Sequence, residues 1–212
     1  MGAVTPHSIA TLMRTGPVIA VLTIEQASDA VPLAQALVAG GVTVLEVTLR
    51  TADAWAAIAA IADAVPEAVV GAGTVLSPHD LDSAQRAGAR FAVSPGLTEP
   101  LIAAAAMSAL PFLPGVATAS ELMRGLDAGL DHFKFFPAEA AGGPAVLKAL
   151  NAPFAQCRFC PTGGVTSQNA PGYLALPNVL CVGGGWIAPA EAIDAKAWDR
   201  ITDLARAASG LR

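Results

Sequence analysis

The stretch EQASDAVPLAQALVAGGVTVLEVTL, residues 25–49, joins a helical pattern to a strand pattern. In its first part Val31, Leu37 and Val38 fall on one helical face, and Gly40-Gly41 ends the helix. Its second part, VTVLEVTL (42–49), is a nearly continuous apolar run, as expected of a parallel strand that is covered on both faces. The stretch therefore predicts a helix followed by a buried strand.

Apolar runs of this kind recur at intervals of roughly 20 to 25 residues, with alanine-rich helical segments between them. The eight runs are PVIAVL (17–22), VTVLEVTL (42–49), AVVGAGT (68–74), RFAVS (90–94), PFLPG (111–115), HFKFFP (132–137), RFCPTGG (158–164) and VLCVGGG (179–185). Strands that alternate with helices are parallel and are joined by crossover helices. Eight such units predict an α/β fold in which residues 1–212 form a single (β/α)8 TIM barrel domain. The rival is a doubly wound open sheet, which usually has fewer strands.

Helix signals support the alternation. Ser77 as N-cap with Pro78 after it predicts a helix over 77–88, and Thr118 with Glu121 has the spacing of a capping box. We also expect a short N-terminal helix over 5–14 before the first strand and a last helix over 189–208.

Composition limits the possible partners. Hydrophobic residues make up 54% of the 212 residues and charged residues 14%, which favours a large core and a subunit interface. The chain has no apolar run long enough to span a membrane. Its net charge is −5 without a basic cluster, so we expect no nucleic-acid partner. The N-terminus lacks the pattern of a signal peptide, and the odd count of three cysteines predicts the cytoplasm.

Cys157 and Cys160 form a CxxC pair, and Cys181 is the third cysteine. The pair is compatible with a redox or metal site, but neither a second cysteine pair nor a nearby histidine completes one. We expect the cysteines to fill the core. The histidines, His7, His79 and His132, are scattered, so we expect no metal site and no cofactor.

The run HFKFFP places a lysine among phenylalanines. Because side chains alternate across a strand, Lys134 shares a face with Phe136, while Phe133 and Phe135 share the other. If Phe133 and Phe135 pack outward against helices, Lys134 points into the barrel, and Glu46 of the second run can point inward too. In a barrel of this kind the active site lies at the C-terminal ends of the strands, where these residues fall.

Lys134 differs from the other two lysines, Lys148 and Lys196, which lie in helical segments. Burial disfavours an ammonium ion, and the neutral amine is the nucleophile that Schiff-base chemistry requires. A buried ion pair with Glu46 explains the same residues without catalysis. Glu46 is a candidate general base or a counter-ion for Arg50. Arg50 offers a fork for a carboxylate or phosphate, or forms a surface salt bridge.

Two glycine-rich turns follow the seventh and eighth runs, Thr162-Gly163-Gly164 and Gly183-Gly184-Gly185. Loops after strands 7 and 8 of such barrels often bind phosphate. Glycine lets backbone N–H groups approach the anion closely. Together the two turns predict a phosphate site.

Several motifs together resemble the 2-keto-3-deoxy-6-phosphogluconate (KDPG) aldolase family, also called 4-hydroxy-2-oxoglutarate (KHG) aldolase. They are LEVTLRT (45–51), GAGTVLSP (71–78), SPGLTEP (94–100), PGVATASEL (114–122), FKFFPAE (133–139), RFCPTGG (158–164) and VGGGW (182–186). The resemblance covers nearly the whole chain in the same order. It implies a metal-free class I aldolase on a barrel, usually a homotrimer.

The resemblance also implies roles for individual residues. The Schiff-base lysine falls on Lys134 and the general acid/base on Glu46. The pocket for the substrate carboxylate and pyruvate falls on Arg50, Thr74, Pro95 and Phe136. The phosphate-binding positions fall on Thr162, Gly163, Gly164, Gly184 and Gly185. Many members have serine where this chain has Gly185, so one hydroxyl contact to phosphate is missing.

The expected reaction cleaves 2-dehydro-3-deoxy-6-phosphogluconate to pyruvate and glyceraldehyde 3-phosphate, in carbohydrate acid catabolism of the Entner–Doudoroff type. The strand 2 and lysine motifs match this gluconate-type branch better than the branch that acts on the galactonate-derived 6-phosphate. Unphosphorylated 4-hydroxy-2-oxoglutarate is another candidate substrate, and a non-catalytic barrel that binds phosphate ligands is the remaining alternative.

Overall fold

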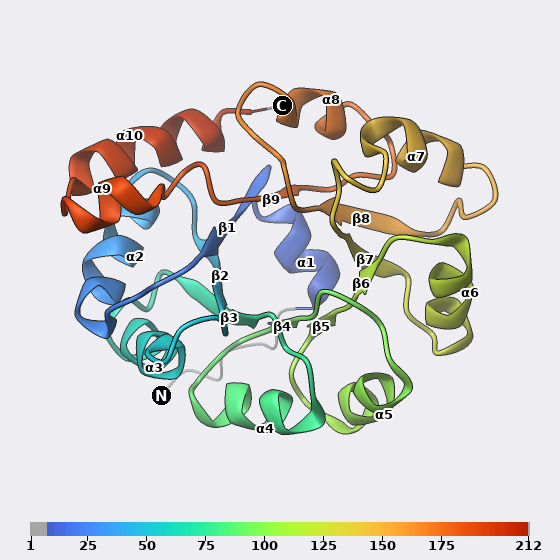
Figure 1. Cartoon of the computed structure of the whole chain (residues 1–212), viewed down its shortest axis with the longest axis horizontal. Coiled ribbons are helices and arrows are strands. Elements are labelled where there is room, and N and C mark those ends of the chain that lie inside the picture. The colour runs from blue at the N-terminus through green and yellow to red at the C-terminus, as the bar shows by residue number, and fades with distance from the viewer. Residues whose placement is uncertain (1–7, 212) are drawn as a thin grey trace.

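The computed structural model describes residues 8–211, in which short strands alternate with helices (Figure 1). The strands are β1 (Val18–Leu22), β2 (Val44–Thr48), β3 (Val69–Gly73), β4 (Ala92–Val93), β5 (Phe112–Leu113), β6 (Gly115–Val116), β7 (His132–Phe135), β8 (Arg158–Pro161) and β9 (Val182–Gly184). Each of the eight predicted runs contains or overlaps a strand. The fifth run, which was expected to form one strand, forms β5 and continues into β6, because Pro114 between them has no N–H for a ladder hydrogen bond.

The helices are α1 (Ile9–Arg14), η1 (Ala27–Asp29, a 3-10 turn), α2 (Ala30–Ala39), α3 (Ala54–Ala64), α4 (Pro78–Arg86), α5 (Glu99–Met107), α6 (Ala119–Asp127), α7 (Gly143–Leu150), α8 (Ala170–Leu174), α9 (Ala190–Asp194) and α10 (Trp198–Ser209). The predicted caps are confirmed, since Ser77 and Thr118 each form a capping box with the residue three positions later. The prediction of one last helix over 189–208 was wrong. Lys196 adopts a left-handed φ of 51°, which ends α9 before α10 begins. The predicted N-terminal helix is present from Ile9, and residues 5–7 of that prediction lie outside the described part.

All strand pairs are parallel. One sheet has six strands in the order β5-β4-β3-β2-β1-β9, and a second has three in the order β6-β7-β8. Two isolated parallel bridges, Phe159 with Val179 and Thr162 with Gly183, join the β8 side to the β9 side. The α/β class is therefore confirmed. The strand order of the larger sheet does not reverse between β1 and β5, which is unlike a doubly wound sheet.

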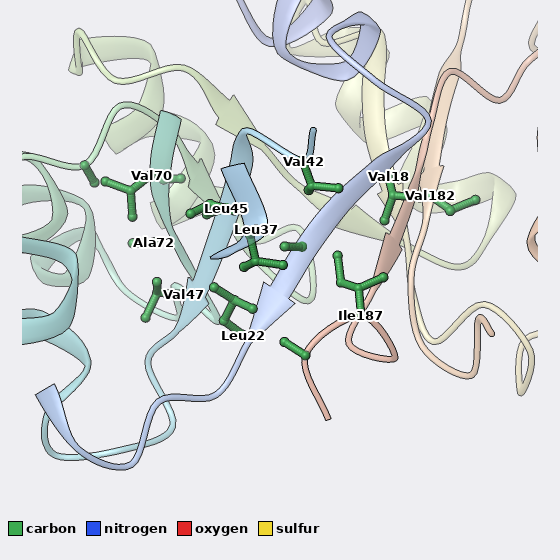
Figure 2. Packing of buried hydrophobic residues seen from close by; sticks show 14 of the residues in the cluster. Val18, Leu22, Leu37, Val42, Leu45, Val47, Val70, Ala72, Val182 and Ile187 are labelled. Carbon is green, nitrogen blue, oxygen red and sulfur yellow. The ribbon is translucent and has the colours of Figure 1, made fainter. Parts of the chain in front are cut away.

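Apolar side chains on the two faces of the strands form two clusters. The larger lies between strands and helices, and Figure 2 shows Leu37 of α2 among Leu22, Leu45 and Val47 of β1 and β2. The smaller cluster contains inward-facing strand residues together with Leu12 and Met13 of α1, which are 1% and 0% exposed. Full burial of side chains of this size contributes about 1.5–3 kcal/mol each. Helix α1 is thus held by packing against the inward faces of the strands.

All three cysteines are free and buried, which confirms that they fill the core. Within residues 8–211, no group of three or more His, Cys, Asp or Glu side chains is arranged to hold a metal ion. In the same part of the chain, every helix is too short or too polar to cross a membrane.

Candidate active site

Lys134 and Glu46 form a buried ion pair. The Lys134 Nζ donates to Glu46 Oε1 over 2.9 Å, and the two residues are 5% and 3% exposed. They come from β7 and β2, 88 positions apart in the chain. Removing two charges from water costs several kcal/mol per ion, which their mutual attraction offsets only in good geometry. A pair of this kind contributes little to net stability, yet it places an amine and a proton acceptor in direct contact.

The strand alternation around Lys134 is as predicted. Phe133 and Phe135 are fully buried in the cluster that faces the helices. Gly125 of α6 is required beside Phe133, because a Cβ there would overlap with the phenyl ring. On the other face, the Phe136 ring centroid lies 5.3 Å from Lys134 Nζ, within the range of a cation–π contact. Lys134 therefore points away from the helices, toward Glu46.

The end of β3 supplies Thr74. This residue has a φ of 61°, a left-handed conformation that is uncommon for a residue with a Cβ. A threonine held in such a conformation costs of order 1–3 kcal/mol and persists only where its surroundings impose it. The strain lies one residue beyond Gly73, on the strand next to the one that carries Glu46.

Pro95 lies in a turn after β4 that is fixed from two sides. The fully buried Ser94 donates its hydroxyl to the Gly96 carbonyl over 2.6 Å. Gly115 of β6 packs against the Pro95 backbone so closely that a Cβ there would overlap with it. Because Gly115 is the register partner of Lys134, the Pro95 turn lies next to the strand of the candidate nucleophile.

Arg50 lies two residues beyond the end of β2 and is exposed. Glu46 pairs with Lys134 and not with Arg50, so the interpretation of Glu46 as a counter-ion for Arg50 was wrong. Across residues 8–211 the guanidinium forms no salt bridge, which also contradicts the surface salt bridge considered for it. The guanidinium is available to a ligand at this end of the strands.

The two glycine turns lie side by side. Thr162 bridges to Gly183, and a Cβ on Gly183 would overlap with the Thr162 hydroxyl. That hydroxyl is buried and lies 3.4 Å from the Cys160 carbonyl oxygen, to which it donates. Gly163 and Gly164 have φ values of 98° and 77°, which glycine adopts without strain. Gly184 is buried under the Trp186 ring, whereas Gly185 is exposed.

Neither histidine within residues 8–211 forms a hydrogen bond or ion pair with a candidate site residue. His132 is the first residue of β7, at the opposite end of the strand from Phe135, and His79 is exposed in the first turn of α4. His7 lies outside the described residues.

Sequence reasoning missed the glycines that make room for the site. Gly73 of β3 leaves space for the Glu46 carboxylate, and Gly115 leaves space for the Pro95 turn. Glycines inside predicted strands are the available signal, since they often mark a close approach of another group. Which group approaches depends on the register between strands, which a single sequence does not reveal.

Comparison with known proteins agrees with this geometry. Residues 9–204 match the family model described as KDPG and KHG aldolase. The KHG/KDPG aldolase of Escherichia coli (strain K12) is 58% identical over 95% of this chain and 94% of that protein.

Two solved structures share the fold of this chain along nearly its whole length. The KDPG aldolase of Legionella pneumophila, captured with pyruvate as a covalent carbinolamine, has a TM-score of 0.93 and 52% identity over 94% of this chain and 97% of that one. The KDPG aldolase of Zymomonas mobilis ZM4 with 3-phosphoglycerate has a TM-score of 0.93 and 53% identity over 98% of both chains. The chain described above belongs to the KDPG and KHG aldolase family.

Proposed function

We propose that the protein is a class I aldolase that cleaves 2-dehydro-3-deoxy-6-phosphogluconate to pyruvate and glyceraldehyde 3-phosphate through a Schiff base on Lys134. The observation that carries the proposal is the buried contact between Lys134 and Glu46 at the ends of parallel strands. Membership of the family supports it, as does the carbinolamine in the Legionella relative, since a carbinolamine forms from an amine and a carbonyl group.

The first step requires a neutral amine. Transfer of one proton from Lys134 to Glu46 along their 2.9 Å hydrogen bond turns the ion pair into an amine and a carboxylic acid. The amine attacks the C2 carbonyl, and a proton moves from its nitrogen to the carbonyl oxygen to give the neutral carbinolamine. Glu46 then gives its proton to the departing hydroxyl group, so that loss of water leaves an iminium ion on Lys134 and a carboxylate on Glu46.

The iminium ion then accepts the electrons of the C3–C4 bond. Glu46, directly or through a water molecule, removes the proton of the C4 hydroxyl, and the bond breaks to give an aldehyde and an enamine. Glu46 returns a proton to C3, and water hydrolyses the iminium ion to release pyruvate and the free amine. One carboxylate next to Lys134 therefore serves each proton transfer.

Residues at the ends of different strands bind different parts of the substrate. Arg50 and Thr74 hold the substrate carboxylate, and Pro95 and Phe136 line the pocket for the pyruvate portion. The two glycine turns bind the phosphate, at positions Thr162, Gly163, Gly164, Gly184 and Gly185, through backbone N–H groups other than that of Thr162, which donates to the Phe135 carbonyl. The free guanidinium of Arg50 and the bridge between Thr162 and Gly183 support this division.

The two sheets form a single (β/α)8 barrel in a one-domain chain, in our proposal. Only Pro114 separates β5 of one sheet from β6 of the other, and the bridges at Thr162 and Phe159 connect the opposite edges.

We also propose a cytoplasmic homotrimer that needs no cofactor and acts in carbohydrate acid breakdown of the Entner–Doudoroff type. Three buried free thiols fit a reducing compartment, and light scattering tests the trimer.

Borohydride trapping tests the aldolase proposal. Pyruvate and borohydride are added to the protein, and the modified residue is located by mass spectrometry. A reduced adduct on Lys134 is expected, and it should be absent from Lys134→Met but present in Lys148→Met, which changes an exposed lysine of α7. No adduct in the parent protein, with phosphate esters still bound, would identify a non-catalytic barrel instead.

A second substrate, 4-hydroxy-2-oxoglutarate, is favoured by the absence of a side chain at Gly185 and by the double name of the Escherichia coli relative. Its cleavage needs Lys134 and Glu46 but no phosphate site. Comparing kcat/KM for this compound with kcat/KM for the gluconate-derived and galactonate-derived 6-phosphates ranks the three candidates.

A further inference from the structure

A hydrogen bond between Glu139 and Tyr173 lies directly behind the first glycine turn. Tyr173 of α8 is fully buried, and its hydroxyl donates to Glu139 Oε1. Glu139 follows β7 by four residues, in the segment that also contains Pro137 and Ala138. Apart from this contact the Glu139 side chain is exposed, so its orientation is set by the buried tyrosine.

Glu139 contacts both glycines of the turn. Its backbone N–H donates to the Gly163 carbonyl over 3.0 Å, and the N–H of Ala138 donates to the Thr162 carbonyl over 2.8 Å. A Cβ on Gly164 would lie 2.7 Å from Glu139 Cγ and 2.8 Å from Glu139 Cβ. The stem of Glu139 therefore lies against Gly164, and the hydrogen bond from Tyr173 holds the carboxylate at the end of that stem.

The far side of the turn is held by Asn169. The Asn169 side chain donates from Nδ2 to the Gly164 carbonyl over 3.0 Å and accepts the backbone N–H of Thr166 over 2.7 Å. The carbonyl groups of Gly163 and Gly164 are thus both bound, each by a donor outside the turn.

Bound carbonyl groups determine where the N–H groups point. In a trans peptide the N–H and the C=O lie in one plane and point in opposite directions. Fixing the carbonyls of Gly163 and Gly164 therefore fixes the N–H groups of Gly164 and Val165. Neither N–H donates to any acceptor in residues 8–211. Successive unpaired N–H groups in such a turn form a concave anion site.

The charge of Glu139 opposes this site. A carboxylate near the turn repels a phosphate, so electrostatic attraction does not account for its presence there. Its contribution is the position of its stem and of its backbone N–H. Glutamine at 139 keeps the stem and an acceptor for Tyr173 while removing the charge, and it separates the two effects.

We propose that Glu139 and Tyr173 are positioning residues that hold the N–H groups of Gly164 and Val165 toward the substrate phosphate, and that they thereby set the preference for phosphorylated substrates. The inference rests on the proposed aldolase function. It extends the site to a hydrogen bond that does not touch the substrate.

The test compares Tyr173→Phe, Glu139→Ala and Glu139→Gln with the parent, using the gluconate-derived 6-phosphate and 4-hydroxy-2-oxoglutarate. Loss of one hydrogen bond corresponds to a rise of about three- to tenfold in KM for the phosphorylated substrate in Tyr173→Phe and Glu139→Ala. We expect KM for the unphosphorylated substrate and kcat for both to stay unchanged. Glu139→Gln should keep the parental KM or lower it. Glu67→Ala, which removes an exposed carboxylate before β3, is the matched control.

Three outcomes would overturn the inference. Equal losses on both substrates would mean that the pair only stabilises the fold, and no loss in Tyr173→Phe and Glu139→Ala would mean that it positions nothing. A loss in Glu139→Gln as large as that in Glu139→Ala would show that the charge matters and the position does not.

Pyruvate trapping separates this inference from the proposed function. Every variant should form the borohydride-reduced adduct as the parent does. A parent protein that fails to trap pyruvate contradicts the aldolase proposal itself. A parent that traps pyruvate, with variants that trap it equally but show no selective rise in KM, contradicts only the role of Glu139 and Tyr173. Glu139→Ala changes an exposed side chain, so it gives an answer even if Tyr173→Phe does not fold.

Discussion

Gly73 leaves the space that the carboxylate of Glu46 occupies. A Cβ on Gly73 would overlap with Glu46 Oε1 and lie 2.8 Å from its Cδ, closer than real Cβ contacts come. Gly73 is the register partner of Thr48, two residues along β2 from Glu46, so both side-chain positions face the same side of the sheet. The carboxylate can reach Lys134 only because β3 has no side chain at this point.

Gly73→Ala should therefore displace the Glu46 carboxylate and slow cleavage. Removing a proton-transfer group costs about 10²–10⁴-fold in turnover, and we expect a loss that approaches this range. The measurement is kcat for cleavage, with borohydride trapping of pyruvate on Lys134 as a readout that should persist. Gly16→Ala is the control, because a Cβ there meets nothing within 4 Å. Parental turnover in Gly73→Ala would contradict the role of Glu46.

Removing one partner of the Lys134–Glu46 pair should lower the free energy of unfolding strongly, whereas replacing both partners by apolar residues should change it little. Glu46→Leu leaves the buried ammonium without a partner, and such a loss destabilises a protein by about 3–5 kcal/mol. The double variant Lys134→Met/Glu46→Leu removes both charges, so its free energy of unfolding should return toward the parental value. Denaturant unfolding of the parent, the single variant and the double variant checks this. A double variant that is less stable than the single one would mean that the pair stabilises the fold.

Gly185→Ser should improve binding of phosphorylated substrates. The glycine has ordinary backbone geometry, and a Cβ there meets only the Val21 carbonyl oxygen, at 3.3 Å, so a small side chain fits with a slight shift. One added hydroxyl donor corresponds to a fall of about two- to tenfold in KM for the 6-phosphate. KM for 4-hydroxy-2-oxoglutarate should not change. Gly185→Ala serves as the control, and an equal improvement there would rule out the hydroxyl as the cause.

Tyr173 should lose its proton at a higher pH than an ordinary tyrosine does. Its contribution to stability should be lost at alkaline pH. Burial, then the hydrogen bond to Glu139 and the charge of that group, raises the pKa of Tyr173 above its ordinary value of 10.0. Because the pKa is higher in the folded than in the unfolded state, the stabilisation is fully present below about pH 10 and is lost as pH rises toward the folded-state pKa. Tyr173 is the only tyrosine of the chain, so the ultraviolet absorbance of its phenolate reports this group alone. Glu139→Gln should lower the pKa relative to the parent, and an identical titration of folded and denatured protein would contradict the prediction.

Local sequence patterns predicted most of the elements. The alternation of apolar runs and helical segments located the strands, and the caps at Ser77 and Thr118 form as their spacing indicates. The fifth strand and the last helix were predicted less well. In both places one backbone position overrides the periodicity: Pro114 lacks an N–H, and Lys196 takes a left-handed φ that its residue type does not favour.

The candidate site was predictable as a set of residues but not as an arrangement. Alternation along β7 placed Lys134 opposite Phe133 and Phe135, since that property depends on one strand alone. The partner of Glu46 remained open between Lys134 and Arg50 until β2 and β7 were placed in space. The hydrogen bond between Glu139 and Tyr173 had no local signal in the sequence, because the two residues are 34 positions apart.

The sequence by itself determined the class of fold, the family and the residue types available for chemistry, because these depend on periodicity and on motifs within short segments. Tertiary structure alone decided that Glu46 faces Lys134, that Gly73 makes room for it, and that Tyr173 holds Glu139 against the glycine turn. The physical reason is register. Contacts across neighbouring strands depend on how the strands are aligned, and packing of the whole core sets that alignment.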